Sequence, residues 1–153
     1  MAEILTIIKS QVDKTAGRKI ASAVQNRVRS AVVQTAAVYA APAVTDTVGT
    51  GLILPLGSRI MLPITLSNGA GTAASTLALG LRDPVTKVAI DATAIMAATA
   101  ITAAATAQVN TGTKLVNGQE YLLPQDCEIY GTFAGAAGAA NQQIRAEIPY
   151  LSP

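Results

Sequence analysis

Histidine and tryptophan are absent from the 153-residue chain, and cysteine occurs once, at Cys127. Without histidine, the chain cannot form a Ser-His-Asp triad, a Cys-His pair or a histidine general base. Zinc sites that use histidine are excluded as well, and one thiolate cannot supply a cysteine-only ligand set. A single cysteine also cannot close a disulfide within the chain. We therefore expect a protein that is not an enzyme, with no catalytic residues, no cofactor and no metal, in which Cys127 is a small core residue.

Carboxylates are the catalytic groups that remain, and Asp126 and Glu128 are the closest pair. Two positions apart on a strand, they share one face. An enzyme built on them would need a carboxylate-only mechanism, but no groove or supporting polar group can be inferred around them. We expect both side chains to be solvated. The glycine-containing segments 49–51 and 69–71 lack the Lys-Ser/Thr ending of a phosphate loop, so we interpret them as turns.

Charged residues make up 13% of the chain and aromatic residues 3%, whereas about 25% charged residues is usual in soluble domains. A surface with so little charge favours packing against copies of the same chain or against another protein. The shortage of aromatic side chains argues against stacking with nucleic acid bases. The uncharged segment 92–113 is mostly Ala and Thr, which are poor membrane formers. We expect a soluble protein without a secretory signal, with no membrane partner and no direct contact with nucleic acid.

Residues 1–35 are expected to form a basic, partly helical N-terminal arm. Six basic and two acidic residues fall within residues 1–30, while the rest of the chain is slightly acidic. Apolar residues recur at helical spacing, first at Ile4, Ile7, Ile8 and Val12, then at Ile20, Val24, Val28 and Val32. Short helices are marginal alone in water, so this stripe must dock on the body of the chain or on a partner. The candidate partner-binding residues are Arg18, Lys19, Ile20, Val24, Arg27, Val28 and Arg29.

Residues 36–153 are expected to form an antiparallel β-sandwich or jelly roll, because short alternating runs are separated by turn residues. The expected strands contain Ile60 to Leu66, Leu77 to Leu81, Val88 to Ile90, Cys127 to Phe133, and Ile144 to Tyr150. Pro63 within the first of them suggests an edge strand or a bulge. Arg82-Asp83-Pro84 predicts a tight connection, and Asn117-Gly118 predicts a hairpin. Ala92 to Ala107 is expected to be a helix or an irregular excursion, because alanine favours helix.

The chain resembles the capsid decoration (cement) proteins of tailed bacteriophages, or a related virion structural protein. The likeness lies in Arg18-Lys19 and Arg27-Val28-Arg29 of the arm, the Ala/Thr/Gly-rich β body, the segment from Leu54 to Arg59, and the ending from Ile144 to Pro153. The resemblance implies a homo-oligomer, often a trimer, that is made in the host cytoplasm and lies on the capsid surface of the virion. Its implied partner is the major capsid protein, and its implied function is to clamp the shell against internal DNA pressure.

Two other functions fit the composition. A tail or head-fibre component would share it, but would form an elongated, intertwined trimer. A carbohydrate-binding β-sandwich module would bind a glycan saturably, although such modules commonly use exposed aromatic platforms, and this chain has four tyrosines and no tryptophan.

Overall fold

The computed structural model describes residues 28–115 and 121–153, and these residues form strands and no helix. The strands are β1 (Val28–Gln34), β2 (Thr47–Leu54), β3 (Arg59–Ile60), β4 (Ile64–Asn68), β5 (Thr76–Arg82), β6 (Ala89–Ala100), β7 (Ala105–Val109), β8 (Tyr121–Leu122), β9 (Cys127–Ala134) and β10 (Ile144–Leu151). No helix among the described residues is long and apolar enough to cross a membrane.

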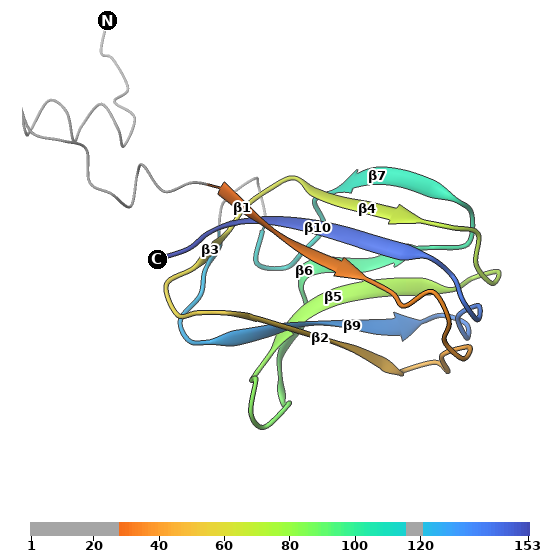
Figure 1. The fold of residues 1–153 in the computed structure, drawn as a ribbon, viewed down its shortest axis with the longest axis horizontal. Coiled ribbons are helices and arrows are strands. Elements are labelled where there is room, and N and C mark those ends of the chain that lie inside the picture. The colour runs from red at the N-terminus through yellow and green to blue at the C-terminus, as the bar shows by residue number, and fades with distance from the viewer. Residues whose placement is uncertain (1–27, 116–120) are drawn as a thin grey trace, which may run out of the picture.

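The strands form two antiparallel sheets that face each other (Figure 1). The four-stranded sheet has the order β2-β9-β5-β6, and the six-stranded sheet has the order β7-β4-β10-β3-β8. The sixth strand, β1, pairs with β10 on the side away from β3 and β4. The short strands β3 and β4 pair with opposite ends of β10, separated by the cis peptide Leu62-Pro63. Among the described residues, β1 pairs only with β10 and β2 pairs only with β9, so each lies at an edge of its sheet.

The core lies between the two sheets, and the central strands β5 and β9 of the four-stranded sheet each bury five consecutive residues. The buried positions of β4 and β10 alternate with exposed or partly exposed ones, as a strand with one covered face requires. The largest buried side chains include Ile60, Ile64 and Ile148 from one sheet, and Leu79, Leu81, Ile129 and Phe133 from the other. Burying each such side chain contributes about 1.5–3 kcal/mol. The mainly β, two-sheet antiparallel architecture predicted from the sequence is therefore confirmed.

The predicted helical series is wrong at Val28 and Val32. Both lie in β1, which pairs with β10 over all seven of its residues and buries Ala31 in the core. A spacing of four places two residues on the same face of a strand as well as of a helix, so the valines alone could not distinguish the two. The rest of the predicted helical arm lies outside the described residues.

The segment from Ala92 to Ala107 is also not helical. Its residues 92–100 lie in β6 and its residues 105–107 in β7, with a short connection between them, and the two strands pair with β5 and β4. Ala94, Ile95 and Met96 are buried there, so packing against the sheets overrides the helical preference of alanine. The hairpin predicted at Asn117-Gly118 falls on residues 116–120, outside the described part, and β8 after it pairs with β3.

Candidate binding surface

The β5–β6 hairpin projects from the lower edge of the body in Figure 1, at the green loop formed by residues 83–88. The carboxylate of Asp83 accepts hydrogen bonds from the backbone nitrogens of Val85 (2.8 Å) and Thr86 (2.7 Å). Backbone bonds between Asp83 and Val88 (2.9 Å) and between Lys87 and Asp83 (3.1 Å) close the turn. The hydrogen bonds from Thr86 and Val85 lower the pKa of Asp83. The loop is therefore internally hydrogen-bonded, as the predicted tight connection requires.

Three apolar side chains of this hairpin face solvent. Val85 is 86% exposed, Val88 65% and Ile90 40%. Valine and isoleucine are normally among the most buried residues, and a group of exposed apolar side chains on one projecting element is typical of a protein-binding site. The hairpin is accordingly our candidate binding surface, which we define as Val85, Val88 and Ile90.

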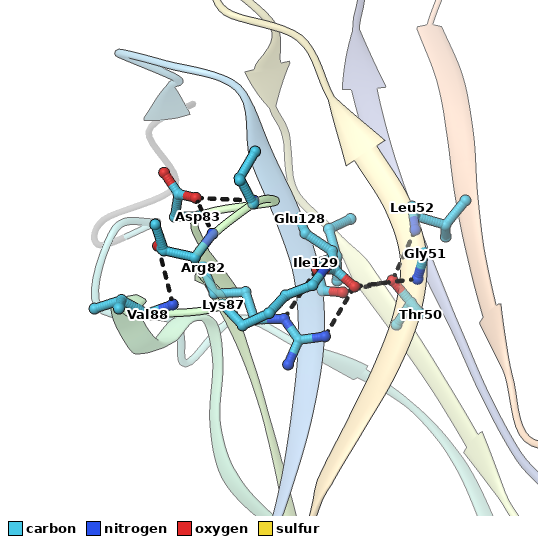
Figure 2. A network of polar contacts seen from close by, with 11 residues as sticks. Thr50, Gly51, Leu52, Arg82, Asp83, Lys87, Val88, Glu128 and Ile129 are labelled. Atoms are coloured by element: carbon cyan, nitrogen blue, oxygen red, sulfur yellow. Dashed lines mark hydrogen bonds and ion pairs between the residues drawn. The ribbon is translucent and has the colours of Figure 1, made fainter.

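A buried carboxylate fixes the hairpin to the body (Figure 2). Glu128, on β9, is only 2% exposed. It accepts two hydrogen bonds from Arg82, from Nε at 3.0 Å and from Nη2 at 2.9 Å, and a third from Lys87 Nζ at 2.7 Å. Arg82 ends β5 and Lys87 lies within the loop, so one carboxylate holds both the base and the far side of the turn.

The neighbouring edge strand completes this network. β2 shifts register between Gly49 and Ile53, and within this bulge the backbone nitrogen of Gly51 donates to Glu128 Oε1 at 3.3 Å. Gly51 has a φ of +67°, a conformation that glycine adopts without strain. At Gly49, a Cβ would lie 2.9 Å from Arg82 Nη2, so glycine leaves room for the guanidinium. The guanidinium also lies 5.2 Å from the centre of the Tyr130 ring, within range of a cation–π interaction.

The electrostatics of the network favour the ionised carboxylate. Hydrogen bonds from Arg82 and Lys87 outweigh the opposing effect of burial, and they lower the pKa of Glu128 to about 2. The carboxylate accepts hydrogen bonds from both cations and from the Gly51 nitrogen, so it connects β2, β5 and the hairpin loop to β9. The expectation that Glu128 is solvated is therefore wrong. Asp126 is exposed, as expected, and it accepts a hydrogen bond from the Leu56 nitrogen at 2.7 Å.

The structure places two of the sequence-predicted partner-binding residues. Val28 and Arg29 begin β1, where both are exposed, Val28 to 59%. They pair with Leu151 and Tyr150 in the six-stranded sheet, and thus belong to a different sheet from the hairpin. The remaining predicted residues lie outside the described part of the chain: Arg18, Lys19, Ile20, Val24 and Arg27.

A cleft of about 560 Å³ lies between the end of β1 and the start of β2. Its lining includes Tyr39, Phe133 and one carboxylate, Asp46, which accepts a hydrogen bond from the Ala43 nitrogen at 2.7 Å. Within residues 28–115 and 121–153, no three His, Cys, Asp or Glu side chains group as metal ligands would.

Comparison with known proteins finds no matching family model and no matching curated protein. Two solved phage capsid structures contain chains with this fold. A chain of the cyanophage Pam1 capsid asymmetric unit is 19% identical, with a TM-score of 0.58, and the match covers 84% of this chain and 86% of that one. A chain of the Ralstonia phage GP4 capsid is 18% identical, with a TM-score of 0.60, and the match covers 83% and 85%. The resemblance to a phage capsid component is thus confirmed at the level of the fold.

Proposed function

We propose that this chain is a non-enzymatic structural protein of a phage virion, which binds the major capsid protein lattice as a decoration (cement) protein and stabilises the head. The observation that carries the proposal is the fold shared with chains of two phage capsids over more than four fifths of each chain. Each match covers nearly the same share of this chain and of the capsid chain, so the matched capsid chains are close to this one in length. In this function the protein lies on the capsid surface as a homo-oligomer, with trimers as the form that the sequence resemblance implies.

The β5–β6 hairpin supports this function because its apolar side chains are exposed on a loop that is already ordered. Burying Val85 and Val88 in a partner's apolar pocket would each contribute about 1.5–3 kcal/mol. A loop fixed by Glu128 and by its own hydrogen bonds loses little conformational freedom on binding, so more of that energy remains as affinity. On a lattice, many such contacts act together and multiply the effective affinity.

The arm is the second proposed contact. Residues 1–27 carry five basic and two acidic side chains, and the basic ones would meet acidic residues of the capsid. In this arrangement Arg18, Lys19, Arg27 and Arg29 supply charge, while Ile20, Val24 and Val28 supply apolar contact.

The test is attachment of the full-length protein to purified phage heads from which it has been removed. Cosedimentation measures binding, and the temperature at which the heads release DNA measures stabilisation. The protein should bind saturably and raise that temperature. The double variant Arg18→Glu/Lys19→Glu should bind more weakly, whereas Lys114→Glu/Arg145→Glu, with the same change of charge on the body, should bind as the unaltered protein does.

Two outcomes would overturn the proposal: failure of the protein to bind heads, and binding that leaves the temperature of DNA release unchanged. A truncated variant for the same test should lack residues 1–27 and begin at Val28. Removing residues through Ser30 would also remove three positions that pair with β10, and the loss of attachment could then reflect unfolding.

A further inference from the structure

We propose that β1 is a self-association strand, which pairs antiparallel with β1 of a second copy and joins two six-stranded sheets into one continuous sheet. The first observation is the open edge. Among the described residues, β1 pairs with β10 on one side and with no strand on the other. An exposed strand edge presents a row of unpaired N–H and C=O groups, which is a template for pairing with another chain.

The register shows which backbone groups are available. Thr35 donates from its backbone nitrogen to the oxygen of Ile144, and Gln34 is in register with Arg145. Because hydrogen-bonding direction alternates along a strand, Arg29, Ala31 and Val33 direct their backbone groups toward β10. The four even-numbered residues, Val28, Ser30, Val32 and Gln34, direct theirs to the open side.

β1 also has few of the devices that usually protect an edge strand. Such devices include bulges, proline and charged side chains, lysine above all, and β1 has one charged residue, Arg29, whose backbone groups face β10. The pairing of β1 with β10 continues over seven residues without a register shift, and β1 contains neither proline nor lysine. By contrast, β2 and β6, the edges of the other sheet, both have register shifts. β7, at another edge of the six-stranded sheet, is shorter, and its exposed residues are Ala105, Thr106, Ala107 and Gln108. β1 instead exposes Val28 to 59% and Val32 to 39%.

A two-fold axis through Ala31 pairs all seven residues of β1 with their counterparts. It places Val28 opposite Gln34 of the second copy, and Ser30 opposite Val32. All four are residues whose backbone groups face the open side, so the hydrogen-bonding groups of the two copies match. A shift by two residues keeps this match but leaves the ends of both strands unpaired, so the full overlap forms the most hydrogen bonds.

Charge favours a second copy in antiparallel orientation. The only charged residue of β1 is Arg29, and in this register it lies opposite Val33 rather than opposite the other Arg29. The 27 residues that precede Val28 have a net charge of +3. Antiparallel pairing lets the two arms leave from opposite ends of the strand pair, about 20 Å apart at about 3.3 Å per residue. Parallel pairing would bring both basic arms together.

This inference does not depend on the capsid function, because it concerns the free protein in solution. The pairing closes with two copies, so a trimer would need a different contact. If β1 does not pair, only this inference fails and the capsid function still stands. If the protein does not attach to heads, only the proposed function fails and the pairing of β1 still stands.

The experiment mixes two full-length variants under mild oxidation, Ser30→Cys and Val32→Cys, each of which adds one exposed cysteine to the buried Cys127. Opposed hydrogen-bonded residues have Cα atoms about 5.5 Å apart, within the range that a disulfide bridges. The mixture should give several-fold more linked dimer than either variant alone. The matched control is Thr106→Cys mixed with Gln108→Cys, at the edge formed by β7, which should give no such excess.

A second measurement guards against a cysteine variant that fails to fold. Val32→Lys places a charge on the open edge and should raise the dimer dissociation constant at least about tenfold, or about 1.4 kcal/mol, in sedimentation equilibrium. Gln108→Lys should leave the constant unchanged. A protein that remains monomeric at every concentration, or an oligomer that Gln108→Lys disrupts and Val32→Lys does not, would overturn the proposal.

Discussion

The Glu128 carboxylate and the Arg82 guanidinium form a two-pronged ion pair across β9 and β5, with bonds of 2.9 and 3.0 Å. The two residues are in register with each other, so sheet formation brings them together without any loop rearrangement. The pair is almost fully buried, with side-chain exposures of 12% for Arg82 and 3% for Glu128. The pair lies at the base of the β5–β6 hairpin. The position of the exposed valines Val85 and Val88 therefore depends on the pairing of β5 with β9.

Removing the charge of Glu128 should destabilise the protein strongly. In Glu128→Gln the amide keeps one oxygen for Arg82, but this largely buried cation loses its counter-charge, whereas Lys87, with a side chain that is 52% exposed, can turn to solvent. We expect a loss of about 3 kcal/mol in the free energy of unfolding, measured by urea denaturation. The control is Glu147→Gln, which removes an exposed ion pair with Arg145 and should cost about 0–1 kcal/mol. Equal losses in the free energy of unfolding for the two substitutions would show that the buried Glu128 pair stabilises the protein no more than the exposed pair does.

The same carboxylate predicts the acid response. Its pKa is about 2 in the folded protein against an ordinary value of 4.5, so the unfolded state binds the proton more tightly. The stabilisation is therefore complete above pH 4.5 and is lost as the pH falls toward 2. Urea midpoints measured across this interval should fall more steeply for the unaltered protein than for Glu128→Gln. If the urea midpoints of the two proteins fall equally with pH, the acid response does not come from Glu128.

Local alternation predicted much of the fold. Ile144, Ala146 and Ile148 occupy the buried face of β10, because a strand that buries one face must repeat every second residue. Leu77, Leu79 and Leu81 also share one face of β5, although Ala78 and Gly80 between them are buried too. This signal failed where spacing or composition was ambiguous. The interval of four between Val28 and Val32 fits both a helix and a strand. The alanines of β6 adopt a strand conformation because β6 pairs with β5.

The Glu128 network that fixes the candidate binding surface was harder to predict, because its residues are distant in sequence. Glu128 and Asp126 have the same chemistry and nearly the same sequence context. What distinguishes them is the approach of Arg82, 46 residues earlier, and of Lys87, 41 residues earlier. The hairpin connection was predicted from Arg82-Asp83-Pro84, but the exposure of Val85 and Val88 depends on how far the loop extends beyond the sheet.

Cys127 should be unreactive in the native protein. It is 1% exposed, and burial, followed by the charges of Asp126 and Asp83, raises its pKa. The thiolate is the reactive form, so a thiol reagent such as Ellman's reagent should label Cys127 only after denaturation. Ser30→Cys, on the exposed strand β1, should provide a second thiol that reacts at once. Rapid labelling of the unaltered protein would mean that the core around β9 opens readily.

The exposed valines of the hairpin should contribute to attachment and not to folding. In Val85→Asp/Val88→Asp, both changed side chains already face solvent, so the free energy of unfolding should change by about 0.5 kcal/mol or less. If the tip fills an apolar pocket on the capsid, the two charges should weaken binding to heads by about 2 kcal/mol or more, which is roughly a thirtyfold loss of affinity. Val44→Asp, at a 44% exposed valine between β1 and β2, is the matched control and should bind normally. Normal binding by the double variant would exclude the hairpin as the contact and leave the basic arm as the proposed site.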